Sequence, residues 1–163
     1  MFSNEDRVRY AKPQIMEVIC QLRFPTILSI GAREPAEFQE QIRSQFPRYS
    51  RSEEKPMKMV NGRMEPQPPV TNYQFLSADG RWKVNLTNSF LALATPAYTC
   101  WEDFANKLDS VLVHLIEIYK PAYFERIGLR YLNFFSRKEL DLEGTPFSQL
   151  FQAPTHFSFR PKS

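Results

Sequence analysis

The chain has 163 residues, of which 42% are hydrophobic and 24% are charged, and its formal net charge is +3 at pH 7. This balance is typical of a globular protein with an aromatic-rich interior and argues against a disordered chain. Cys20 and Cys100 show no C-x-x-C spacing, and we interpret them as reduced thiols rather than a disulfide framework. There is no signal-peptide pattern and no apolar run of membrane-spanning length, so we expect a cytoplasmic protein without membrane contact.

The first predicted element is a half-buried strand over residues 15–24, which follows a polar arm at residues 1–12. Apolar residues such as Val18, Cys20 and Leu22 recur at every second position of this stretch. Glu17 falls on the other side of the strand, where a local polar cluster would account for it. A shorter helix is predicted next over residues 35–46, with a narrow apolar line that places it at the margin of a sheet.

Residues 47–70 differ in composition from the rest of the chain, because they combine several prolines with few large apolar residues. We interpret this stretch as a flexible, Pro-rich, basic loop. A nucleic-acid-binding arm would have the same composition, although only Tyr49 is available to stack on a base. The basic residues in and beside the stretch are Arg43, Arg48, Arg51, Lys55, Lys58 and Arg63.

The stretch from Tyr73 to Thr95 predicts three antiparallel strands in a meander. Asp79-Gly80 is a strong signal for a tight hairpin turn, and Asn88-Ser89 offers a second turn. Alternating apolar residues lie between and around these turns, as half-buried strands require.

The strongest helix signal follows over residues 99–120. Thr99 and Glu102 have the spacing of a capping box, and Pro121 ends the helix. Apolar residues recur at steps of three and four, which predicts one broad buried face. These residues are Trp101, Phe104, Leu108, Val111, Leu112, Leu115, Ile118 and Tyr119.

The final predicted strand of the domain runs from residue 126 to about 134. Ile127, Leu129, Tyr131 and Asn133 alternate with residues of the opposite side. If the apolar side meets the helix, Arg126 and Arg130 share the opposite face about 13 Å apart. These arginines then either solvate an exposed sheet face or form a cationic face for an anionic ligand or partner. We take four residues as candidate binding residues: Arg126, Arg130, Asn133 and Glu17.

Together these elements predict an α+β fold. We expect a mainly antiparallel five-stranded sheet with two helices on one face, in the order β-α-β-β-β-α-β. The first and last strands are expected to pair in the centre of the sheet. Residues 1–135 form the domain, and residues 136–163 form a C-terminal extension, which we interpret as the truncated start of a second part. Within that extension, residues 146–151 suit a short helix and residues 156–160 a strand.

Several motifs resemble a sporadically distributed prokaryotic family of uncharacterised proteins. The resemblance covers roughly residues 10–135, and its most specific part is R-x-G-L-R-Y-x-N at residues 126–133. It implies a bacterial or archaeal source, the same element order and a longer parent protein, and it implies no reaction. The other motifs are Pro13 with Glu17-Val18, Trp82-x-Val84-x-Leu86-Thr87, and Tyr98-x-x-Trp101-x-x-Phe104.

No phosphate-binding glycine motif, cofactor motif, metal-ligand spacing or catalytic pair stands out in the sequence. Our first hypothesis is therefore a non-enzymatic binding or assembly module, acting on an unknown protein partner or through self-association. The second is nucleic-acid binding through residues 43–63 and the face of Arg126 and Arg130. The third is a small-molecule-processing enzyme built around the four candidate residues.

Overall fold

The computed structural model describes residues 14–146, except residues 56, 61, 67 and 139, and also residue 149. Residues 15–133 form one compact unit, and the described residues outside that range belong to another. The first unit contains β1 (Ile15–Arg23), α1 (Leu28–Ala32), α2 (Ala36–Ile42), β2 (Arg48–Glu54), β3 (Met57–Val60), β4 (Arg63–Pro66), β5 (Val70–Leu76), β6 (Lys83–Leu86), β7 (Phe90–Thr95), α3 (Trp101–Tyr119) and β8 (Arg126–Asn133).

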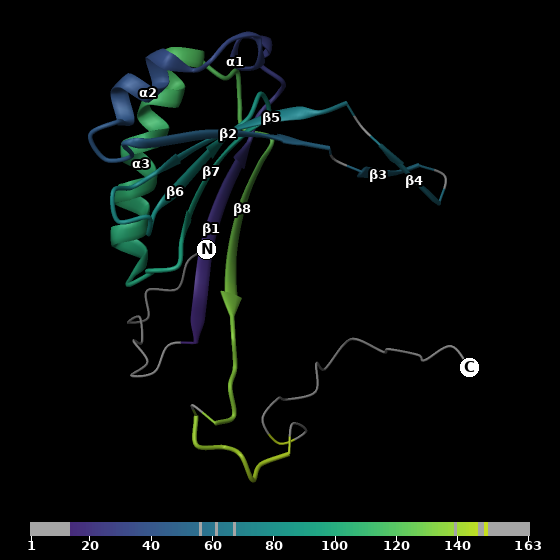
Figure 1. The fold of residues 1–163 in the computed structure, drawn as a ribbon, viewed down its shortest axis with the longest axis vertical. Helices are drawn as coiled ribbons and strands as arrows, with labels where there is room; N and C mark the ends of the chain where they lie inside the picture. The colour runs from purple at the N-terminus through teal and green to yellow at the C-terminus, as the bar shows by residue number, and fades with distance from the viewer. Residues whose placement is uncertain are drawn as a thin grey trace. The chain divides into compact units, whose positions relative to one another are not determined.

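Six of these strands form one sheet in the order β2-β5-β6-β7-β1-β8, and every neighbouring pair is antiparallel. β3 and β4 form a separate two-stranded hairpin. Helices α2 and α3 lie side by side on one face of the sheet (Figure 1). The α+β class and the mainly antiparallel sheet predicted from the sequence are confirmed.

The prediction of five strands and two helices is wrong in its counts, because the main sheet has six strands and the described residues contain three helices. The added strand, β2, and the β3–β4 hairpin fall in the stretch predicted to be a loop. All side chains of β2 are exposed, so no buried face marks it in the sequence. Its main chain pairs with β5 from Arg48 opposite Leu76 to Glu54 opposite Val70, and this pairing overrides the weak local signal. Helix α1 has five residues, too few for a periodic pattern.

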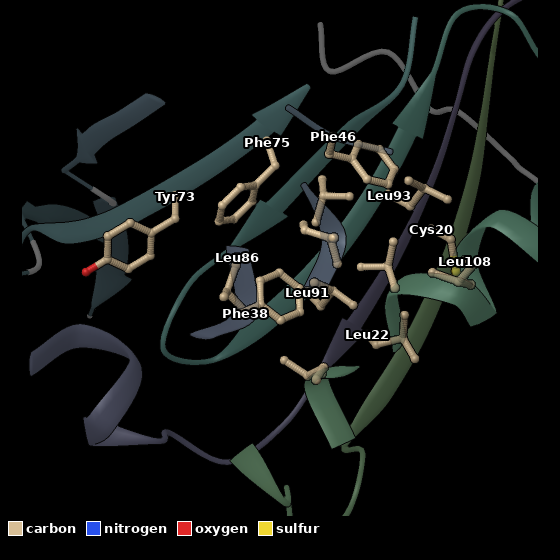
Figure 2. Packing of buried hydrophobic residues seen from close by; sticks show 14 of the residues in the cluster. Cys20, Leu22, Phe38, Phe46, Tyr73, Phe75, Leu86, Leu91, Leu93 and Leu108 are labelled. Carbon is tan, nitrogen blue, oxygen red and sulfur yellow. The ribbon is translucent and has the colours of Figure 1, made fainter. Parts of the chain in front are cut away.

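The hydrophobic core lies between the helices and the sheet (Figure 2). From α3, the fully buried Phe104 packs against Trp82, Tyr98 and Trp101, with ring centroids 5.9, 6.2 and 6.1 Å away. From α2, Phe38 meets Phe75 of β5 edge to face at 5.6 Å. The apolar face predicted for the long helix is therefore the face that fills this core, through Phe104, Leu108, Val111 and Leu115.

The start of α3 differs from the predicted capping box. The N-cap residue is Cys100, and its side chain makes no capping hydrogen bond. Thr99 lies one residue earlier, and its hydroxyl donates to a carboxylate oxygen of Asp103 at 2.6 Å. A capping box needs its hydroxyl at the N-cap position, so the shift of one residue removes it. The helix ends as expected before Pro121, with Lys120 in the left-handed region at φ 48°.

The meander of β5, β6 and β7 is confirmed, but the turn at Asp79-Gly80 is not a two-residue hairpin. β5 ends at Leu76 and β6 begins at Lys83, and the turn is closed by the Gly80 amide donating to the Ser77 carbonyl at 2.9 Å. The Asp79 carboxylate accepts from the Ser77 hydroxyl and the Arg81 amide, at 2.5 and 3.0 Å. These bonds lower the pKa of Asp79 and stabilise the longer turn.

The predicted arm at residues 1–12 and the predicted strand at residues 156–160 lie outside the described residues, and the predicted helix at 146–151 lies mostly outside them. Within the described part of the chain, none of the helices has the length and apolar character needed to cross a membrane.

Candidate functional site

Strand β8 forms one edge of the main sheet. It pairs with β1 on one side, from Arg23 opposite Arg126 to Ile15 opposite Asn133, and among the described residues it has no neighbour on the other. The prediction that the first and last strands pair is correct. The prediction that this pair lies in the centre of the sheet is wrong, because β8 is an edge strand. Alternate N–H and C=O groups of β8 therefore point away from β1 along a strand of eight residues.

One side of β8 continues the core-facing side of β1. Opposite residues of paired strands share a face, and Leu22 and Cys20 of β1 stand opposite Ile127 and Leu129. The two β1 side chains are 3% and 2% exposed, whereas Ile127 is 67% and Leu129 is 43% exposed. The apolar side of β8 thus has the orientation predicted from the sequence but lacks the expected cover. The core layer stops at β1 because β8 lies at the edge, so apolar side chains remain open beside it.

At one end of this apolar side, Tyr131 contacts Tyr98, which precedes α3. Its ring meets that of Tyr98 edge to face at 5.4 Å, and the two hydroxyl oxygens lie 3.3 Å apart. Burial, followed by this hydrogen bond, raises the pKa of Tyr98. Tyr98 in turn packs against Phe104, so this end of β8 is tied to the core through two aromatic rings.

The opposite side of β8 carries the two arginines around Gly128. The Arg126 guanidinium donates to the Gln21 side-chain oxygen at 3.1 Å. A Cβ at Gly128 would stand 4.0 Å from two nitrogens of that guanidinium, so Arg126 lies along the space that the glycine leaves free. A partly open depression of about 320 Å³ results, lined by Ile19, Gln21, Arg126, Gly128, Leu129 and Arg130.

On β1 and β8, this side carries three arginines and one carboxylate, that of Glu17 opposite Leu132, so its charge is mainly positive. Arg23 of β1 stands directly opposite Arg126, and Arg130 lies four residues, or two repeats of the pleat, further along the same side. β8 itself contains no acidic residue. A carboxylate brought to this side would therefore meet cations on both strands.

The structure brings two of the four predicted site residues together. Arg126 and Arg130 both line the depression, whereas Asn133 and Glu17 are not among its lining residues. A register shift between Ile15 and Glu17 places Asn133 opposite Ile15, at the far end of β8. Glu17 stands opposite Leu132 and is half-buried.

The lining residues that the sequence-based prediction omitted include, besides Gly128 and Leu129 of β8, two residues of β1, Ile19 and Gln21. Their alternation with Val18 and Cys20 placed them on the side of β1 that faces away from the helices. Only the register of β1 against β8, with Gln21 opposite Gly128, brings them to the arginines.

Other potentially reactive groups are buried or are engaged in hydrogen bonds within the fold. Burial raises the pKa of the Cys20 thiol, which disfavours the thiolate. Glu34 accepts hydrogen bonds from the Tyr49 hydroxyl and, at 2.8 Å, from the Arg51 guanidinium. Within the described ranges, no three His, Cys, Asp or Glu side chains come close enough together to hold a metal ion.

No protein-family model matches this chain, and neither a curated protein nor a solved structure matches it. The geometry of β8 and of the residues beside it is therefore the basis for the function proposed below.

Proposed function

We propose that this chain is a non-enzymatic binding or assembly module that recruits its partner through β8. The observation that carries the proposal is the exposed apolar side of an edge strand, with Ile127, Leu129 and Tyr131 between 39% and 67% exposed. Edge strands are commonly shortened, charged or covered, because an apolar edge invites another strand. A contiguous apolar patch beside an open edge is typical of an interaction surface.

The test compares a charge on the β8 surface with the same charge elsewhere. Leu129→Lys places a cation on the apolar side of β8, and Leu28→Lys is the matched control because Leu28 is 79% exposed on α1. Tagged wild-type and variant chains are used to retain partners from native extract, and light scattering measures self-association. A discrete partner or a dimer that survives Leu28→Lys and is lost with Leu129→Lys supports the proposal. A monomer that retains nothing, or a partner indifferent to Leu129→Lys, contradicts it.

A nucleic-acid-binding function is the alternative that the arginines of β8 favour. Arg126 and Arg130 line one depression, and Arg23 adds a third positive charge on the same side. The basic stretch at residues 43–63 gives weaker support, because Arg51 pairs with Glu34 and Arg43 with Glu40 at 2.8 and 3.1 Å. This alternative requires that the affinity for a labelled oligonucleotide fall steeply with salt, and that Arg126→Ala with Arg130→Ala reduce that slope.

Membership of a prokaryotic family of uncharacterised proteins, which the motif at residues 126–133 resembles, also remains a proposal. An enzyme built on Arg126, Arg130, Asn133 and Glu17 gains no support from the depression, because Asn133 and Glu17 are not among its lining residues.

A further inference from the structure

We propose that the partner of β8 is an extended segment of another protein, apolar at every second residue and acidic at two intervening positions four residues apart. The segment adds to the main sheet as a seventh strand, antiparallel to β8. This inference rests on the proposed function and names the chemistry that the partner must have.

The main chain of β8 supplies the first half of the recognition. Its outward N–H and C=O groups, which have no sheet neighbour in the described part of the chain, repeat along eight residues and match those of any extended segment. Such hydrogen bonds give affinity without selecting a sequence, so the selection comes from side chains directly opposite each other, about 5 Å apart between Cβ atoms.

The two sides of β8 make different demands on the partner. On the helix side, residues opposite Ile127, Leu129 and Tyr131 must be apolar to cover surfaces that are 39% to 67% exposed. On the other side, a residue opposite Arg126 or Arg130 meets a guanidinium, and Arg23 stands next in line beyond Arg126. On this side of β1 and β8, three arginines stand against one carboxylate, that of Glu17, so acidic residues at those two positions balance the remaining positive charge.

A second copy of this chain fits these demands poorly. In two antiparallel copies of β8, a register centred on Gly128 or on Arg130 sets arginine opposite arginine. A register centred on Leu129 matches the apolar side, with Ile127 opposite Tyr131. Even there, Arg130 of one copy lies diagonal to Arg126 and Arg130 of the other, roughly 7–8 Å away. Four guanidiniums would gather on one side without an acidic partner from β8, so charge disfavours self-pairing.

The probe for this inference is a fluorescein-labelled peptide, Thr-Thr-Val-Glu-Ile-Thr-Val-Glu, which sets its two glutamates opposite Arg130 and Arg126. The control peptide has lysine in place of both glutamates. An opposite-charge pair directly across two strands stabilises their pairing, whereas a like-charge pair destabilises it. We therefore expect the acidic peptide to bind about tenfold more tightly in fluorescence anisotropy. The difference should shrink as salt is added.

The variant Arg126→Glu with Arg130→Glu should reverse this preference. Both side chains are exposed, so the exchange leaves the core intact, which circular dichroism and thermal unfolding verify. Two further acidic peptides carry N-methyl groups at alternate amides, either those that face β8 or those that face away. Strand addition predicts that one of these peptides loses binding and the other keeps it, because only one set of amides faces the sheet.

Equal affinity for the acidic and basic peptides, absence of binding, or loss with both N-methylated peptides would overturn the inference. So would a stable dimer that Leu129→Lys dissociates, because the occupant of β8 would then be a second copy. If the acidic peptide fails while a partner sensitive to Leu129→Lys is retained from native extract, the proposed function stands and only the partner chemistry is wrong.

Discussion

Replacing Phe104 tests whether α3 is held on the sheet by its aromatic contacts. Phe104 is fully buried, and its ring meets three others at centroid distances of 5.9 to 6.2 Å. Truncating a buried phenylalanine to alanine costs roughly 3–5 kcal/mol, and the loss of aromatic pairs favours the upper part of this range. We expect Phe104→Ala to lower the free energy of unfolding by about 4 kcal/mol. That is a large share of the roughly 5–15 kcal/mol of a typical domain.

Urea denaturation, monitored by circular dichroism, measures this change in the free energy of unfolding, provided that its dependence on urea concentration has the same slope in variant and wild type. Phe104→Leu keeps most of the volume and should cost about 1.5 kcal/mol, which gives a usable value if the alanine variant does not fold. Val113→Ala is the control on the same helix, because Val113 is 44% exposed, and it should stay within about 0.5 kcal/mol of wild type. A cost for Phe104→Ala below about 1.5 kcal/mol, or equal to that of Val113→Ala, would refute the packing described for α3.

Two further predictions concern the start of α3 and the alkaline limit of stability. Thr99→Ala should cost less than about 0.5 kcal/mol in urea denaturation, because Thr99 is not the N-cap residue; a loss near 1 kcal/mol, typical of a removed cap, would contradict this. Burial, followed by the charge of Glu37, raises the pKa of Tyr119 to about 12. Above about pH 10 the unfolded chain loses this proton while the folded chain keeps it, so stability falls as the pH rises. Tyr119→Phe should reduce the fall in urea midpoint between about pH 8 and pH 11, and an unchanged fall would disprove the assignment.

The sequence correctly predicts the elements that carry a strong hydrophobic period. Its patterns predict the face of α3 that includes Phe104 and Leu108, and they predict the alternation of β1 and of β8. These three features were sufficient to predict an α+β fold. The sequence also indicated that Arg126 and Arg130 share one side of their strand. These features depend only on which side chains a regular backbone places together.

What covers each face of these elements became known only from their arrangement in space. The same alternation describes a strand covered by a helix and a strand at an open edge, so the sequence could not show that Cys20 is buried while Leu129, directly opposite, is 43% exposed. Strand β2 escaped prediction because its pairing with β5 uses main-chain groups that every residue has. For the same reason the depression beside Gly128 emerged only with the register of β1 against β8. A repeat along one chain reports which residues share a face, whereas the cover over that face depends on segments distant in sequence.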